Sequence, residues 1–244
     1  MNPVYDFLKR AFKRSIHALD WDLIRYNVNT SDDLALQKII QFHGIRTVID
    51  GGANIGQYSQ ALIEGGFKGK IFSFEPIPSV FKELERRSSG FSQWKVFNLG
   101  LGSKEDESFI NVSENFVSSS ILQVAKQSLD AEPQTRTTHR EKIRITTLDN
   151  FFTGEYKLDK ETLLKLDVQG YEMEALRGAL TILPEVLIIQ AELSFVPLYE
   201  NGPLFHDMVS FLEKHGFEVY SIIPGFKDVN TGRLLQADGI FVRK

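Results

Sequence analysis

The chain of 244 residues contains no cysteine. This absence excludes disulfides, cysteine-ligated zinc, iron–sulfur clusters and a cysteine nucleophile. No apolar run approaches the roughly 18 residues that a membrane-spanning helix needs. Residues 1–21 also lack the unbroken apolar core and the small-residue cleavage site of a secretory signal peptide, so we expect a cytoplasmic protein.

A surplus of basic residues is absent as well. The chain has 28 lysines and arginines against 32 aspartates and glutamates, a formal net charge of -4. A dominant nucleic-acid partner normally requires a basic balance, so none is expected. With 42% hydrophobic and 25% charged residues, the composition is that of an ordinary globular protein. The length favours one domain with extensions.

The N-terminal part predicts a helical extension over residues 1–44. Apolar side chains recur at three- and four-residue spacing over residues 4–26, with several lysines and arginines among them. Such a helix either packs on the domain with a solvated basic face or makes a weak contact with a membrane surface or a partner. A second helix is expected from an N-cap near Ser31 to about Phe42.

From residue 45 to residue 244, apolar strands alternate with helical segments. Expected strands cover residues 47–50, 70–74, 94–99, 162–166, 185–191, 217–223 and 239–243. Expected helices cover residues 55–64, 79–87, 171–180 and 204–215, with a serine cap at the second. Alternation of this kind predicts a doubly wound α/β domain, with a mostly parallel sheet between two helical layers.

Residues 101–161 interrupt this pattern as a polar insertion. Residues 107–112 and 142–147 alternate like strands, and their pairing would extend the sheet. Residues 113–141 between them are rich in serine, threonine and glutamine. A long, weakly periodic segment inside a compact domain is usually a lid, a binding loop or disorder. We interpret it as a lid that orders over a bound substrate.

The strongest motif is Val48-Ile49-Asp50-Gly51-Gly52-Ala53-Asn54-Ile55-Gly56, an apolar strand that leads through a glycine-rich turn into a helix. Glycines let a ligand approach the backbone, and a helix N-terminus presents N–H groups to it. The turn lacks the G-x-G-x-x-G pattern of dinucleotide sites. It resembles instead the first motif of class I methyltransferases, where the turn cradles the methionine part of S-adenosylmethionine. This resemblance assigns Asp50 to the amino group of that ligand. The cradle residues are Gly52, Ala53, Asn54 and Gly56.

Two further strand ends fit the same ligand. Glu75, followed by Pro76, ends the second expected strand, where an acid accepts hydrogen bonds from both ribose hydroxyls. The alternative is a solvated turn glutamate. The third strand ends at Asn98 and Leu99, which would read the adenine edge and pack on its face. The alternative for Asn98 is a plain turn residue.

Taken together, these segments resemble the FkbM-type methyltransferases. The matching segments are residues 50–56, 74–76, 98–100, 147–149, 166–172 and 236–241. The resemblance covers roughly residues 45–243. It implies a seven-stranded Rossmann-like sheet and S-adenosylmethionine as cofactor. It also implies O-methylation of a hydroxyl on a sugar, polyketide or other secondary metabolite.

A hydroxyl acceptor must lose its proton, so a base or a metal ion is needed beside the methyl group. Asp167 follows the fourth strand at the expected switch point, as base, metal ligand or cofactor contact. The alternative is an aspartate that caps the following helix. Glu192 ends the fifth strand on the same rim. These motifs contain no matching lysine or arginine, so a cation such as Mg²⁺ between the carboxylates is one hypothesis and direct base catalysis by Asp167 is the other. His206, at a helix start, is a third catalytic candidate, and Glu172 is either structural or part of the site.

Other functions stay open at this point. A nicotinamide-dependent oxidoreductase uses a similar sheet but needs the missing dinucleotide motif and a recognisable catalytic pair. A non-catalytic S-adenosylmethionine-binding module would not need the acids at Asp167, Glu172 and Glu192. A nucleic-acid methyltransferase is disfavoured by the charge balance and by the lack of an Asn-Pro-Pro-Tyr motif. We expect a small-molecule hydroxyl acceptor, and the oligomeric state is not predicted.

Overall fold

The computed structural model describes residues 10, 12–16, 18, 27–154 and 156–244. It separates two compact units, Met1–Phe42 and His43–Lys244. Most of the helix predicted over residues 4–26 lies outside the described residues, although residues 12–16 are helical. Helix α2 (Asp32–Phe42) begins where the sequence predicts, because the hydroxyl of Ser31 accepts the Leu34 N–H at 3.3 Å. No described helix has the length and apolar character to cross a membrane.

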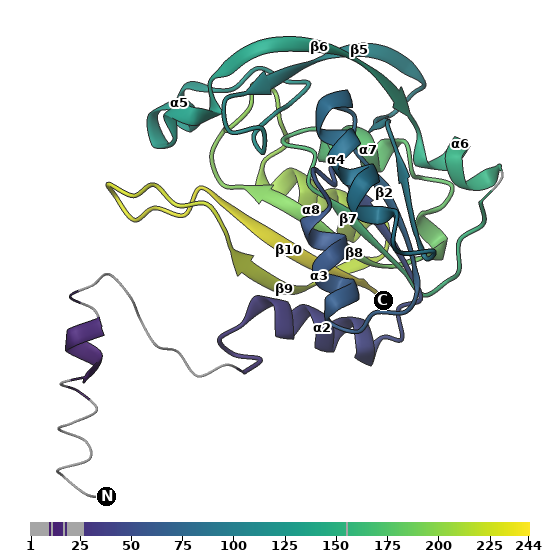
Figure 1. Cartoon of the computed structure of the whole chain (residues 1–244), viewed down its shortest axis with the longest axis horizontal. Coiled ribbons are helices and arrows are strands. Elements are labelled where there is room, and N and C mark those ends of the chain that lie inside the picture. Colours follow the sequence, from purple (N-terminus) through teal and green to yellow (C-terminus); the bar gives the residue numbers. More distant parts are fainter. Residues whose placement is uncertain (1–9, 11, 17, 19–26, 155) are drawn as a thin grey trace, which may run out of the picture. The chain divides into compact units, whose positions relative to one another are not determined.

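The second unit is built on a seven-stranded sheet in the order β3-β2-β1-β7-β8-β10-β9 (Figure 1). Its strands are β1 (Thr47–Gly51), β2 (Lys70–Phe74), β3 (Trp94–Phe97), β7 (Thr162–Leu166), β8 (Val186–Ser194), β9 (Phe217–Pro224) and β10 (Gln236–Arg243). The neighbouring strands β3, β2, β1, β7 and β8 are parallel, and β10 is antiparallel to both its neighbours. The order reverses between β1 and β7. Open α/β sheets bind ligands at such a switch point.

Helices cover this sheet. They are α3 (Gln57–Glu64), α4 (Pro78–Ser88), α6 (Leu148–Thr153), α7 (Glu172–Arg177) and α8 (Phe205–Lys214). Every residue of β1 and β7 is buried, as in central strands that are covered on both faces. The predicted doubly wound α/β fold is confirmed. Two helix details differ: Ile77, not a serine, caps α4 ahead of Pro78, and α7 ends early at Gly178.

The insertion forms a second, three-stranded sheet in the order β4-β6-β5. Its strands are β4 (Gly100–Leu101), β5 (Asp106–Ser113) and β6 (Thr137–Thr146), and β5 and β6 run along the top of Figure 1. The predicted pairing of the two long strands is confirmed, but they do not extend the main sheet. The chain continues from β3 into β4, and β4 pairs with β6 of the second sheet. One face of this second sheet buries Ile110 and Ile145 against Val80 of α4.

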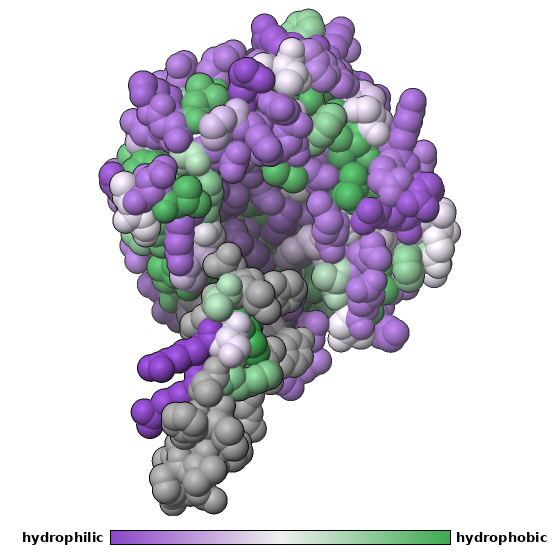
Figure 2. All heavy atoms as spheres, turned by 60° about the vertical axis from the view of Figure 1, so that its left-hand side comes forward, coloured by the Kyte–Doolittle hydropathy of each residue, from purple (hydrophilic) through white to green (hydrophobic). Residues whose placement is uncertain are grey.

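Residues between β5 and β6 are more regular than their composition indicates. They contain α5 (Lys126–Ala131) and a single 3₁₀ turn at Pro133–Thr135. The interpretation of residues 113–141 as a lid stays a prediction. Figure 2 shows one face of the molecule, where apolar side chains are dispersed among hydrophilic ones around a hollow.

Candidate active site

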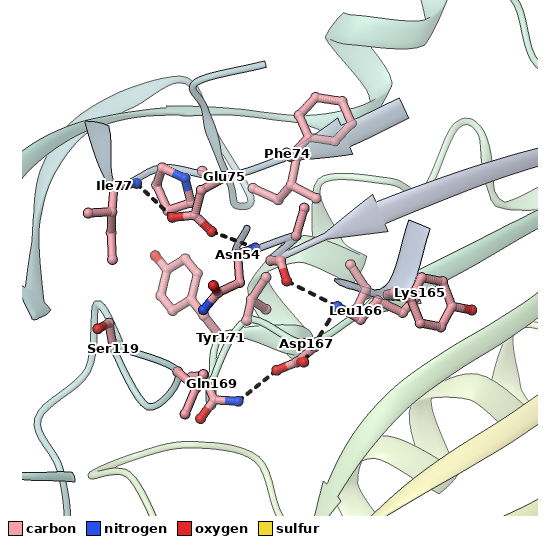
Figure 3. Close-up of a pocket in the computed structure, with 18 of the residues that line it drawn as sticks. Asn54, Phe74, Glu75, Ile77, Ser119, Lys165, Leu166, Asp167, Gln169 and Tyr171 are labelled. Carbon is pink, nitrogen blue, oxygen red and sulfur yellow. Dashed lines mark hydrogen bonds and ion pairs between the residues drawn. The ribbon is translucent and has the colours of Figure 1, made fainter. Parts of the chain in front are cut away.

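A pocket of about 270 Å³ lies at the switch point (Figure 3). Its lining comes from the turn after β1, the ends of β2 and β7, the segment after β3, and residues 116–121 of the insertion. This volume is near the lower end of small-molecule sites, roughly 300 Å³. The carboxyl ends of β1, β2 and β7 meet here because these strands are parallel neighbours.

The turn after β1 packs closely against the segments that follow β7 and β2. Gly52 has φ +74°, and a Cβ there would lie 1.8 Å from the carbonyl oxygen of Asp167, so only glycine fits. The N–H groups of Gly52 and Ala53 donate to the Phe74 carbonyl at 3.1 and 2.9 Å, which ties the turn to β2. Gly52, Ala53 and Asn54 all line the pocket.

Two residues that the resemblance assigns to the ligand lie behind the turn instead. Gly56, with φ +90°, begins α3, and a Cβ there would meet the Trp94 ring at 2.6 Å. Asp50 is fully buried and accepts a hydrogen bond from the Ser59 hydroxyl at 2.7 Å. Its other oxygen lies 3.1 Å from the ammonium of Lys165. Neither residue is among the described residues that line the pocket. In this structure Asp50 therefore braces the turn, and its assignment to the amino group of the ligand stays a prediction.

Glu75 lies at the end of β2 with its carboxylate in the pocket lining (Figure 3). Its two oxygens accept the N–H groups of Asn54 at 2.9 Å and Ile77 at 2.8 Å. Burial raises the pKa of Glu75 from 4.5 to about 7. Each carboxylate oxygen can accept a second hydrogen bond, so the group can still receive a pair of hydroxyls.

Asn98 differs from its predicted contact with adenine. Its amide donates to the carbonyl oxygens of Glu75 and Pro76, at 2.9 and 3.0 Å, and so holds the backbone after β2. Among the described residues, Pro76 and Leu99 line the pocket and Asn98 does not. The apolar contact predicted for Leu99 remains compatible with its position.

Asp167 lines the pocket with a side chain that is 40% exposed. Beside it lies a buried cation that sequence reasoning missed. The ammonium of Lys165 is 3.4 Å from Asp167 and donates to the Gly52 carbonyl at 3.0 Å. Burial opposes the charge of Lys165, but Asp50 and Asp167 outweigh it and keep its pKa above the usual value. A charged residue within the apolar strand Thr162–Leu166 was the available signal, because a buried charge needs a partner.

Gln169 joins the two rim carboxylates. Its amide nitrogen donates to Asp167 at 2.6 Å and to Glu192 at 2.9 Å, and its amide oxygen accepts the Tyr199 hydroxyl at 2.5 Å. Asp167 and Glu192 thus converge, but through a neutral amide and beside Lys165. The premise of the metal hypothesis, that no cation accompanies these acids, is therefore wrong. Among the described residues no group of three or more candidate ligands is arranged to hold a metal ion.

Three other candidates lie outside the lining described for the pocket. Glu192 lies within β8 opposite Asp238, and burial, with Asp167 adding to it, raises its pKa well above the usual value. Glu172 is buried, and its Oε1 accepts the N–H groups of residues 168 and 170, each at 3.1 Å. His206 is 74% exposed and lies 3.5 Å from Asp207. This exposed position outside the lining gives no support to the catalytic role predicted for His206.

The lining also includes residues that no motif marked. The hydroxyl of Tyr58 donates to Gln190 at 2.9 Å, and both side chains line the pocket together with Asp238. Phe116 and Val117 reach the pocket from the insertion. Their sequence surroundings carry no recognisable signal, because only the fold of the insertion brings them to the switch point.

The sheet order, with β10 antiparallel beside β8, and the acid-ended strands around the pocket define the class I methyltransferase fold. The model of the FkbM methyltransferase domain matches residues 50–219. The chain belongs to the FkbM methyltransferase family. The resemblance seen in the sequence is confirmed.

Curated relatives are distant. Methyltransferase 1 of Beauveria bassiana is 25% identical over 142 residues, 54% of this chain and 57% of that protein. Methyltransferase sdnD of Sordaria araneosa is 27% identical over 158 residues, 54% of this chain and 59% of that protein. The AMB antimetabolite synthetase AmbE of Pseudomonas aeruginosa is 26% identical over 211 residues, 70% of this chain and 9% of the synthetase. The chain thus matches less than two thirds of the length of each.

Solved structures with a similar fold are more distant still. A TehB-like S-adenosylmethionine-dependent methyltransferase from Corynebacterium glutamicum shares 12% identity, with all of both chains covered and a TM-score of 0.42. Fibrillarin from Aeropyrum pernix, solved with S-adenosylmethionine bound, shares 11% identity over 82% of this chain and 66% of that chain, with a TM-score of 0.45.

Proposed function

We propose that the protein is an S-adenosylmethionine-dependent O-methyltransferase that acts on a hydroxyl of a small molecule, such as a sugar, a polyketide or another secondary metabolite. The observation that carries this proposal is one pocket with two different acids. Glu75 is held by backbone N–H groups beside the glycine turn, and Asp167 is half-exposed beside Lys165.

The residues present fit the cofactor. Gly52, Ala53 and Asn54 of the glycine turn line the pocket, so their backbone is available to the ligand. Glu75 can accept two ribose hydroxyls, and Pro76 and Leu99 offer apolar surface for the base. The acids of the pocket also suit a cofactor whose sulfonium and ammonium groups outweigh its single carboxylate. When bound, the cofactor supplies an electrophilic methyl group.

Asp167 is the residue to which we assign the proton of the acceptor hydroxyl. As the acceptor oxygen bonds to the methyl carbon, the bond from that carbon to the sulfur of the cofactor would break and leave a neutral thioether. The O–H bond of the acceptor breaks at the same time, and a carboxylate oxygen of Asp167 takes the proton. Lys165 and Gln169 fix the orientation of that carboxylate by contacts at 3.4 and 2.6 Å. An aliphatic hydroxyl is too weak an acid to ionise unaided, which is why a positioned base supports a hydroxyl acceptor.

The comparisons bear on one of the two alternative functions, the oxidoreductase, and not on the other, the non-catalytic binding module. Membership of the FkbM family argues against a nicotinamide-dependent oxidoreductase. A non-catalytic binding module would also keep the glycine turn and Glu75, so turnover must separate it from an enzyme.

The test is Asp167→Asn, compared with the wild type and with His206→Gln. Transfer of tritiated methyl groups from S-adenosylmethionine to a metabolite extract of the source organism measures turnover, and calorimetry with S-adenosylhomocysteine measures cofactor affinity. We expect Asp167→Asn to lose about 10²- to 10⁴-fold in turnover while cofactor affinity is retained. His206→Gln should keep both, because its side chain is exposed outside the pocket. Near wild-type turnover in Asp167→Asn would reject its role as base.

A further inference from the structure

The insertion forms an apolar wall on one side of the pocket. Phe116 and Val117 line the pocket and are 47% and 54% exposed, and Ile121 lines it beside them. Large apolar side chains exposed inside a concave site offer area that a ligand can cover. We call Phe116, Val117 and Ile121 the apolar wall.

The segment that carries this wall is hydrogen-bonded to the side of the pocket that contains Asp167, whereas Ile121 packs toward Ile77. The hydroxyl of Tyr199 donates to the Ser118 carbonyl at 3.2 Å and also to Gln169. The hydroxyl of Ser120 donates to the Gln169 carbonyl at 2.6 Å. Gln169 in turn holds Asp167 at 2.6 Å. Figure 3 shows Ser119 and Gln169 on the side of the pocket across from Glu75.

Local hydrogen bonds keep the wall in place. Phe116 has φ +60°, a conformation that costs free energy for a bulky side chain and persists only when its surroundings hold it. The Ser119 hydroxyl donates to the Phe116 carbonyl at 2.7 Å, and the Asn115 side chain accepts the Ser118 N–H at 3.1 Å. The apolar wall is therefore a built surface, and Phe116 and Val117 belong to the part of it that hydrogen bonds tie to Gln169.

The charges of the pocket restrict the ligand further. Among the described lining residues Lys165 is the only cation, and no arginine or histidine is present. Its ammonium already contacts Asp50, Asp167 and the Gly52 carbonyl. Asp238 adds another carboxylate to the lining. Proteins bind phosphate through arginine, lysine or free backbone N–H groups, so a phosphate at this end would meet repulsion without a partner.

We infer, on the basis of the proposed function, that the acceptor is an uncharged or cationic hydroxyl compound with an apolar face. Phosphorylated acceptors, including sugars linked to a nucleoside diphosphate, are excluded. The apolar part of the acceptor covers Phe116 and Val117, and its hydroxyl points to Asp167.

The charge of the methylated product tests this inference even while the acceptor itself is unidentified. The full chain is incubated with tritiated S-adenosylmethionine and the metabolite extract, and the labelled product is passed over an anion exchanger and a reversed-phase column at neutral pH. We expect the label to pass the exchanger and to be retained by the reversed phase. Label retained on the exchanger would overturn the inference and leave the proposed enzyme intact. No transfer, with S-adenosylhomocysteine still bound, would overturn both.

A charged wall provides a second test. Val117→Lys should lower kcat/KM for the acceptor fraction by about tenfold, mainly through KM, because the variant exchanges apolar contact for an ammonium. The affinity for S-adenosylhomocysteine should not change. Val229→Lys is the matched control, since this valine is 85% exposed and not among the lining residues. Undiminished or faster labelling with Val117→Lys would overturn the inference.

Discussion

Two buried glutamates, Glu75 after β2 and Glu172 at the start of α7, have nearly the same surroundings. Each accepts two backbone N–H groups, and burial raises the pKa of each from 4.5 to about 7. They differ in geometry. Glu75 receives one N–H on each oxygen and lines the pocket, whereas Glu172 receives both on Oε1 and is not among the lining residues.

This difference shows what a raised pKa can and cannot indicate. Burial is the largest cause of the raised pKa in both residues, so the shift does not identify the one that binds a ligand. The direction of the remaining acceptor positions does: those of Glu75 face the pocket, and the hydrogen bonds of Glu172 hold the turn after β7. The comparison predicts that replacing glutamate with glutamine will weaken cofactor binding at Glu75 but not at Glu172.

Glu75→Gln should have the largest effect on the cofactor site. Glutamine has one acceptor oxygen, so its NH₂ group must face the N–H of Asn54 or of Ile77, and one ribose contact is lost as well. We expect the affinity for S-adenosylhomocysteine to fall by about 1.5–3 kcal/mol, measured by calorimetry. Glu172→Gln is the matched control and should bind normally. Equal affinities for the two folded variants would remove Glu75 from the site.

Much of the fold could be predicted because the central strands are buried on both faces. Their apolar runs give the observed bounds of β2 and β7, and the acid or glycine at each strand end gives the location of the ligand site. The pairing between β5 and β6 could also be predicted, because apolar and polar residues alternate in both segments of the sequence. Their separation from the main sheet was not, because it depends on β4 pairing with β6, a contact that no local pattern encodes.

The site was predictable where one residue at a strand end suffices. Glu75 and Asp167 both line the pocket. Lys165 was hidden inside an apolar strand, and the amide of Gln169 becomes a bridge only when β8 brings Glu192 beside it. The orientation of His206 was not predictable, because a helix start does not determine which way its first side chains point.

Glu172→Ala should have the next largest effect, on stability. The substitution leaves the N–H groups of Val168 and Gly170 without their carboxylate partner in a buried turn. We expect the free energy of unfolding, measured by urea denaturation, to fall by about 2 kcal/mol. Glu85→Ala, on an exposed position of α4, should change it by less than about 0.5 kcal/mol. A similarly small change for Glu172→Ala would show that the turn does not depend on this carboxylate.

Glu172→Gln should have an effect that is smallest near pH 4.5 and that grows as pH rises. Both N–H donors contact Oε1, so the amide can keep them and place its NH₂ group on the other side. Burial raises the pKa of Glu172 to about 7 in the folded state, against 4.5 when it is exposed. Between these values the folded state holds the proton more tightly, so ionisation lowers the free energy of unfolding of the wild type as pH rises.

The amide does not ionise, so the variant escapes this loss. Relative to the wild type, Glu172→Gln should be equally stable near pH 4.5 and should gain up to about 3 kcal/mol by pH 8, with the change nearly complete above pH 7. Glu75 titrates in both proteins and cancels in the difference. Urea denaturation at pH 4.5, 6 and 8 measures the trend. A difference that stays constant across this range would mean that Glu172 keeps an ordinary pKa, and the likeness between the two glutamates would then fail.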